Sequence, residues 1–502
     1  MVTEAITSSP SLAVGREANA QTLIGGAFSL TLRSLISQVI NYGIHIGLGR
    51  FFAPAAYAYF GIIASTFSIM ETLLRWGLGR AVAFYVAQDR EGAQQVLKKS
   101  LQLQTVYTLT CFFVFFSLSD RLAVILGDPG LSSYLRWGAF FILTFAFVPV
   151  YTGFLNGAGA FRQQGAIAVI ISVARLLFIV ILLAAGMEIY GVIVAYTASA
   201  LVATAYGIWA SRPDRGDAKE RVQAKNIIAF GFPLFISALA GSLLMRMDLF
   251  MIQSLLSDRV LTGLYASASA LIKGPYFLSH GAGLVVFRTV AQLKAKSPSE
   301  VRGFISRTIY YYILVLAPVP FILSAAAEPI LGLSFGHNYL PAAPAFKILT
   351  FCFVFMILHH VLTSLIAALD RPRLSMSLSL CLLPVQIFLT YEWISIGGLV
   401  GVAFATTASW ALGVLIGCVY MLRAGYLVLP KWTTFLKIAI ASLSSYYVAL
   451  WGSPSGLWLL GFCALIYFVY FGLLRLMGEL GNGEVQMLVA TFLPAKTRSQ
   501  SA

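Results

Sequence analysis

Long apolar segments alternate with short polar segments over almost the whole chain. Fourteen of these segments approach or exceed the roughly 20 apolar residues that a helix needs to cross a membrane. They lie near 22–48, 55–78, 100–119, 134–155, 166–186, 190–210, 227–255, 260–286, 305–327, 343–368, 375–394, 397–422, 434–451 and 455–475. The pattern predicts an all-α polytopic membrane protein with about 14 transmembrane helices.

One part of this pattern occurs twice. Residues 61–99 contain an apolar run, a Gly-x-Gly step at 77–79 and then a basic amphipathic stretch. A second version begins at Gly263, with its Gly-x-Gly step at 281–283. Because chance rarely repeats these features in one order, we infer an internal duplication, an architecture from which many transporters are built.

Composition agrees with a membrane protein. The 502 residues are 59% hydrophobic and only 11% charged, with a mean hydropathy of +0.85. Soluble domains carry roughly 25% charged residues. The polar N-terminus has no basic region followed by an apolar core, so we expect no cleavable signal there. All five cysteines lie in apolar runs without metal-ligand spacing, which favours a packing role.

The net charge of +15 follows the membrane topology. Of the 34 Lys and Arg, 24 lie in the terminal tails and in the loops of one side, and only 5 lie in the loops of the other. The positive-inside rule therefore places both termini in the cytoplasm. Basic loops also attract anionic lipid headgroups. We expect membrane lipids as partners and no nucleic acid.

The spans and the charged segments divide the chain into six parts. The most polar internal segment, S-R-P-D-R-G-D-A-K-E-R-V-Q-A-K, separates two groups of six spans. We expect a cytoplasmic N-tail (1–21), an N-lobe (22–210), a cytoplasmic linker (211–226), a C-lobe (227–422), two further spans (423–475) and a cytoplasmic C-tail (476–502).

Several motifs together resemble the polysaccharide transporter family of the multidrug/oligosaccharidyl-lipid/polysaccharide (MOP) exporter superfamily. They are L-G-R-F-F-A-P-A-A-Y-A-Y-F-G (48–61), R-W-G-L-G-R-A-V-A (75–83), N-G-A-G-A-F-R (156–162), F-G-F-P-L-F-I-S-A-L-A-G-S-L-L-M-R-M-D (230–248), F-G-H-N-Y-L-P-A-A-P-A-F-K-I-L (335–349) and L-D-R-P-R (369–373). The resemblance covers nearly the whole chain in order.

The resemblance implies two six-helix lobes arranged as a V around a central cavity, followed by two C-terminal helices. It also implies a flippase of the bacterial inner membrane. Its substrate would be an undecaprenyl-pyrophosphate-linked glycan, moved to the outer leaflet for O-antigen, exopolysaccharide or capsule assembly. A polysaccharide polymerase and other assembly proteins are candidate partners.

Charged residues within the spans are costly, so each is a candidate for function. Arg75 lies four residues after Glu71, the spacing of an ion pair on one helix face. Asp248 lies two residues after Arg246, on another face, so the two cannot neutralise each other within one helix. For Arg175 we favour a structural role between helices, because the resemblance places its span away from the cavity wall.

These charges suit an anionic substrate, because fixed cations replace the hydration shell of a pyrophosphate and the guanidinium fork matches its oxygens. Polar side chains of the first span would face the sugars. The predicted substrate-binding residues are Arg33, Arg246, Lys273, Arg75, Asp248 and Asn41. We expect no cofactor and no metal; His359 and His360 are adjacent, so their side chains diverge on a helix.

Three alternatives remain open on sequence alone. A drug or cation antiporter of the same superfamily is favoured by twelve spans and an acidic cavity, whereas a lipid II flippase shares the fourteen spans and the basic cavity. A polytopic enzyme would need grouped reactive residues in a large outer loop, and the outer loops here are short. The chain contains no G-x-x-x-x-G-K-[S/T] loop, so we expect no built-in ATPase.

Overall fold

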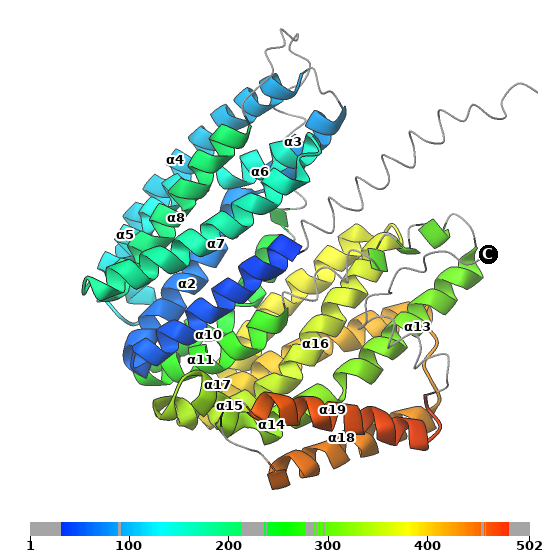
Figure 1. Ribbon diagram of the computed structural model, residues 1–502. Helices are drawn as coiled ribbons and strands as arrows, with labels where there is room; N and C mark the ends of the chain where they lie inside the picture. The colour runs from blue at the N-terminus through cyan, green and yellow to red at the C-terminus, as the bar shows by residue number, and fades with distance from the viewer. Residues whose placement is uncertain are drawn as a thin grey trace, which may run out of the picture. The chain divides into compact units, whose positions relative to one another are not determined.

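The structure is a computed structural model of the chain. It describes residues 32–88, 92–211, 235–236, 238–276, 286–287, 289–290, 292–294, 297–452, 456 and 458–480. Every regular element in these ranges is a helix (Figure 1), which confirms the all-α class. The predicted N-tail, the linker beyond Ser211 and the chain after Leu480 lie outside the described residues.

Ten helices of the described part are long and apolar enough to cross a membrane. The number becomes eleven if the bent pair Ala238–Leu244 and α10 (Met247–Leu256) crosses as one span. One of the ten, α17 (Pro372–Arg423), has non-helical backbone at Gly398, beside the gap predicted between two spans. These helices confirm the polytopic membrane class, and the number fourteen stays a prediction.

The contacts of the chain group into two units, Met1–Gly263 and Leu264–Ala502. The predicted lobe boundary at 211–226 falls almost wholly outside the described residues, and the V-shaped arrangement stays a prediction. The first unit contains helix 32–51, α2 (Pro54–Arg75), α3 (Leu78–Gln88), α4 (Ala93–Ile125), α5 (Leu131–Phe145), α6 (Val148–Gly157), α7 (Phe161–Ala184), α8 (Glu188–Ala210) and α10. Helix α11 (Arg259–Tyr276) runs from the first unit into the second.

In the first unit, α7 lies beside α8 and α4 beside α5 (Figure 1). The first repeated Gly-x-Gly step forms the break between α2 and α3, where Gly77 has the left-handed φ of 80°. Helix α3 then packs very closely on α6. A Cβ atom added at Gly153 would lie 2.1 Å from the backbone oxygen of Gly79, so only glycine fits there. The matching step at 281–283 is outside the described residues.

The second unit is built from α13 (Pro298–Leu316), α14 (Pro318–Ala325), α15 (Ala327–Ser334), η1 (His337–Ala342), α16 (Ala343–Ala368), α17, α18 (Trp432–Gly452) and α19 (Trp458–Leu476). Pro318 has no N–H, so the carbonyl of Leu314 loses its helical partner. Tyr470 of α19 donates a hydrogen bond to that carbonyl at 2.9 Å. The last helix is thereby attached to the α13–α14 kink.

Candidate functional site

Polar side chains join helix 32–51 to α7 in the first unit. Ser37 Oγ lies 2.5 Å from Ser172 Oγ, and Asn41 Nδ2 donates to the same hydroxyl at 3.1 Å. Asn41 Oδ1 accepts a hydrogen bond from Arg175 Nη1 at 3.3 Å. Ser37 and Asn41 are one helical turn apart and therefore share a face. Asn41, a predicted site residue, is held in place by this network.

Arg175 lies at the meeting point of four helices. It is only 7% exposed, and its guanidinium carbon lies 3.8 Å from the centroid of the Tyr196 ring on α8. Its Nη2 is 3.8 Å from Oε1 of Glu71 on α2. These contacts agree with the structural role that the sequence favours. They also place Arg175 near Glu71, the carboxylate that Arg75 also approaches.

Glu71 is shared between two arginines. The predicted pair within α2 is present, with 3.9 Å between Glu71 Oε2 and Arg75 Nη2, while Oε1 faces Arg175. Both distances exceed that of a hydrogen bond, so neither oxygen of Glu71 is held tightly by these arginines. The Arg75 side chain is 54% exposed, whereas that of Arg175 is 9% exposed.

Arg246 lies where the seventh predicted span is broken. The helix Ala238–Leu244 and α10 meet there at an angle of 45°. Arg246 therefore precedes α10 and interacts electrostatically with Asp248 in the first turn, which a continuous helix would hold on another face. It also interacts with Glu71 and Tyr196. Its Nε is buried and has no hydrogen-bond partner among the described residues.

We call Arg75, Arg175 and Arg246, gathered near Glu71, the arginine cluster. Together with Asp248 the group contains three guanidinium groups and two carboxylates, so the cluster keeps an excess of positive charge. The amino end of α10 adds the partial positive charge of a helix N-terminus. An excess of cations among membrane-spanning helices is costly unless water or an anion compensates it. The cluster can therefore hold an anionic group.

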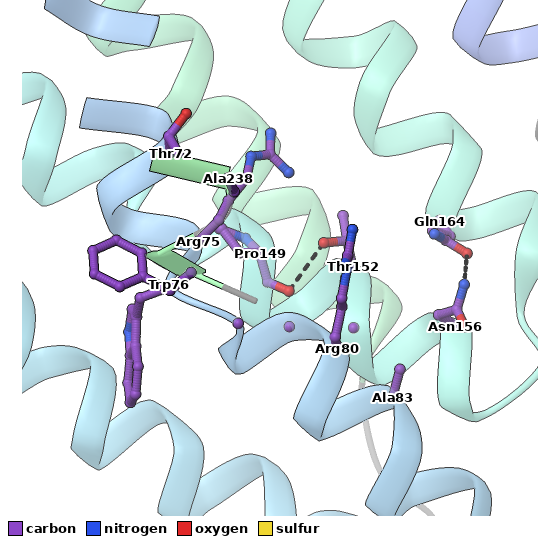
Figure 2. A pocket seen from close by; sticks show the side chains of 14 residues that line it. Thr72, Arg75, Trp76, Arg80, Ala83, Pro149, Thr152, Asn156, Gln164 and Ala238 are labelled. Carbon is purple, nitrogen blue, oxygen red and sulfur yellow. Dashed lines mark hydrogen bonds between the residues drawn. The ribbon is translucent and has the colours of Figure 1, made fainter. Parts of the chain in front are cut away.

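A pocket of about 400 Å³ opens next to the cluster, at the break between α2 and α3. We call it the α2–α3 pocket, and Figure 2 shows the residues that line it. Arg75 and Arg80 contribute its positive charge. Asn156 Nδ2 donates to Gln164 Oε1 at 2.9 Å in its wall. The described lining residues are Thr72, Arg75, Trp76, Gly77, Gly79, Arg80, Ala83, Pro149, Thr152, Gly153, Asn156, Gln164, Phe235 and Ala238, and they include no acid.

An ion pair in the first unit joins the α4–α5 loop to the first residue of α11. Asp128, between α4 and α5, accepts hydrogen bonds from Arg259 Nε at 2.7 Å and Nη2 at 2.9 Å. Arg259 also lies 5.0 Å from the centroid of the Tyr59 ring. Burial alone would raise the pKa of the Asp128 carboxyl, but the hydrogen bonds and charge of Arg259 outweigh burial. The pKa is therefore held below its ordinary value.

Comparison with known families gives one match that covers more than half of the chain. Residues 48–344 match the family described as "Polysaccharide biosynthesis protein". The chain belongs to this family. Comparison with curated protein sequences gave no match.

Several solved structures share the fold of this chain. The lipid II flippase MurJ, in an inward closed conformation, has a TM-score of 0.70 at 15% identity, covering 90% of this chain and 99% of its own. An inward-facing multidrug resistance MATE family transporter of the MOP superfamily has 0.64 at 18% identity, covering 77% and 95%. The eukaryotic MATE transporter AtDTX14 has 0.58 at 14% identity, covering 86% and 99%. The chain thus has the same fold as these transporters.

The structure brings together four of the six predicted site residues of this family member. Asn41, Arg75, Arg246 and Asp248 lie in or beside the arginine cluster. Arg33 is partly buried on helix 32–51, about two turns before Asn41. Lys273 lies in the last turn of α11, in the part grouped with the second unit.

The prediction missed the wall of the α2–α3 pocket. Arg80 and Asn156 both stand in motifs that carry the family resemblance, but nothing in those motifs indicates that they approach each other. Gln164, which completes the wall, lies just after the second of these motifs. The sequence feature that could have indicated this pocket is the Gly-x-Gly step. Close packing at Gly79 and Gly153 brings α3 and α6 into contact, and with them the segments that carry Arg80 and Asn156.

The two adjacent histidines have different neighbours in the second unit. His359 Nε2 lies 3.2 Å from Ser379 Oγ, and its ring meets Trp410 edge-on at 5.3 Å between centroids. The ring of His360 instead meets Tyr276 at 6.1 Å. Among the described residues, no group of three or more His, Cys, Asp or Glu could hold a metal ion.

Proposed function

We propose that the protein is a flippase for polyprenyl-pyrophosphate-linked oligosaccharides. It moves repeat units from the cytoplasmic to the outer leaflet of the bacterial inner membrane, for O-antigen, exopolysaccharide or capsule assembly. Family membership supports the link to polysaccharide biosynthesis. The shared fold supports movement by alternating access of two lobes. The substrate keeps its covalent structure throughout, so the proposed activity is transport and not catalysis.

The observation that carries the proposal is the excess of positive charge in the arginine cluster. A pyrophosphate cannot cross hydrocarbon without partners for its charge. Arg246 has a buried Nε without a partner among the described residues, and Arg75 has an exposed guanidinium. Guanidinium groups bind phosphate oxygens through parallel hydrogen bonds. Both side chains are therefore available to an anionic headgroup, with Arg33 and Lys273 proposed as further contacts.

The test asks whether the positive charge of residue 246 is enough for export, or whether the guanidinium group itself is needed. We expect Arg246→Lys to keep part of the export of surface polysaccharide, because the charge remains. Arg246→Ala should lose most export while the protein stays at normal abundance in the membrane. If abundance falls in parallel with export, the residue belongs to the scaffold. Full export by the Ala variant at normal abundance would remove Arg246 from the proposed site.

A lipid II flippase is the second candidate. The MurJ structure matches 90% of this chain, and the arginine cluster suits any lipid-linked pyrophosphate. Complementation separates the two functions. We expect the gene to restore surface polysaccharide in a strain lacking its glycan flippase and not to restore growth in a strain lacking its lipid II flippase. The reverse outcome would favour the peptidoglycan precursor as substrate.

A further inference from the structure

The α2–α3 pocket has the composition of a site for a phosphorylated sugar. Its two guanidinium groups, from Arg75 and Arg80, supply donors and positive charge for a phosphate. A volume of about 400 Å³ lies near the lower end of the roughly 300–1,000 Å³ of small-molecule sites. It therefore suits one sugar with its phosphate and not a whole repeat unit.

The amide pair in the wall supplies the sugar contacts. One hydrogen bond joins Asn156 Nδ2 to Gln164 Oε1. The carbonyl oxygen of Asn156 and the NH₂ group of Gln164 take no part in this hydrogen bond. If both amide groups are turned over, one NH₂ group and one carbonyl oxygen of the pair still take no part in it. A sugar hydroxyl donates and accepts, so the pair is complementary to it. In the view of Figure 2, Arg80 lies between this pair and Arg75.

The floor of the pocket is rigid. A Cβ added at Gly153 on α6 would meet the backbone of Gly79, and one added at Gly79 on α3 would lie 2.6 Å from the backbone oxygen of Pro149, so neither glycine tolerates a side chain without movement of the backbone. Thr152 donates its hydroxyl to the backbone oxygens of Val148 and Pro149, so its orientation is fixed. A preformed site loses less conformational entropy on binding.

We propose that the α2–α3 pocket is a loading subsite for the sugar that is attached to the pyrophosphate. Arg75 and Arg80 hold the phosphate, and Asn156 and Gln164 hold the sugar hydroxyls. The inference rests on the proposed function, and the predicted topology puts Arg80 and Arg162 on the cytoplasmic side, where the substrate arrives. Arg75 lines the pocket and also pairs with Glu71. Arg75 therefore belongs both to the subsite and to the arginine cluster.

Thiol protection in the purified protein tests the subsite without any transport. In a background lacking the five native cysteines, Ala83→Cys places a thiol in the lining, and Ala87→Cys places one on the exposed face one turn further along α3. The probes are glucose 1-phosphate, galactose 1-phosphate, N-acetylglucosamine 1-phosphate and inorganic pyrophosphate. We expect at least one sugar phosphate to slow labelling at 83 and none to slow it at 87.

Two substitutions assign the contacts. Arg80→Ala should weaken protection at 83 by about ten- to a hundredfold, the loss expected for a hydrogen bond to a charged group. Gln164→Ala should weaken protection by the sugar phosphates and leave protection by pyrophosphate unchanged. Equal protection by pyrophosphate and by every sugar phosphate, or protection that survives Arg80→Ala, would overturn the subsite.

The labelling experiment can fail while the proposed function stands, and the proposed function can fail while the labelling experiment succeeds. Normal export by Arg246→Ala would refute the role of the arginine cluster and leave the labelling result in force. Protection absent at 83, together with export lost in Arg246→Ala, would refute the subsite alone.

Discussion

Arg175 is the one buried arginine of the cluster, and its replacement tests whether Glu71 holds the helices together. Arg175→Met keeps an apolar stem of similar length and removes the charge. Two unit charges attract by about 4 kcal/mol at this separation of 3.8 Å with an effective dielectric constant of about 20. The buried contact with the Tyr196 ring contributes about 2 kcal/mol more.

These gains are offset by the cost of burying the guanidinium, which is several kcal/mol. Breaking a buried pair by removing one partner typically costs about 3–5 kcal/mol. Arg75 and Arg246 still face Glu71 in the variant, so its carboxylate is not left alone. We therefore expect Arg175→Met to lower the free energy of unfolding by about 3 kcal/mol, at the lower end of this range.

A double-mutant cycle with Glu71→Gln measures the pair itself. The free energy of unfolding is obtained by titration with SDS in mixed micelles, for the two single variants and the double variant. We expect a coupling energy of about 1–3 kcal/mol. The matched control is Arg75→Met, which removes a largely exposed guanidinium at a similar distance from Glu71 and should cost about 0–1 kcal/mol. A coupling below about 0.5 kcal/mol would refute the reasoning.

Three further predictions concern other parts of the first unit and the topology. Gly153→Val should sharply reduce folded protein in the membrane, measured by abundance and by fluorescence-detected gel filtration, because its side chain meets the backbone of α3. The Asp128 pKa is lowered by folding, so its ion pair stabilises the protein above the ordinary Asp pKa of about 3.9, and this stabilisation is lost as the pH falls through the lowered value. Melting temperatures between pH 3 and pH 6 should therefore depend less on pH in Asp128→Asn. In intact cells, an impermeant thiol reagent should label a cysteine at Asn338 and not one at Asp217 in the cysteine-free background; the opposite result would reverse the topology.

The sequence predicts the membrane class well because hydropathy acts locally. Each span needs only its own run of apolar residues, so α7 and α16 follow the predicted ranges within a few residues. The pair of Glu71 and Arg75 is also local, since four residues form one turn. The role of Arg175 between helices is a prediction of a different kind, because it comes from the family resemblance, which places the span of Arg175 away from the cavity wall.

The parts of the site that the sequence does not predict depend on helix breaks and on packing between distant segments. Nothing in the run from 238 to 256 marks Met245 and Arg246 as a break, because the run has no proline and both residues favour helix. Asn156 and Gln164 lie eight residues apart on two helices, and their hydrogen bond depends on the turn between them. Such contacts follow from tertiary structure and not from periodicity.

The position of Arg246 is unfavourable for stability by itself, and this bears on its role. A cation at the amino end of a helix opposes the helix dipole, at a cost of about 0.3–1 kcal/mol. Asp248 in the first turn of α10 offsets part of this cost. Its carboxylate also accepts a hydrogen bond from the backbone N–H of Leu249, so it does not serve Arg246 alone. An anion bound near Arg246 would be attracted by the guanidinium and by the helix dipole together. The same arrangement that costs helix stability would therefore strengthen the binding of a pyrophosphate, which is why we place Arg246 at the centre of the proposed site.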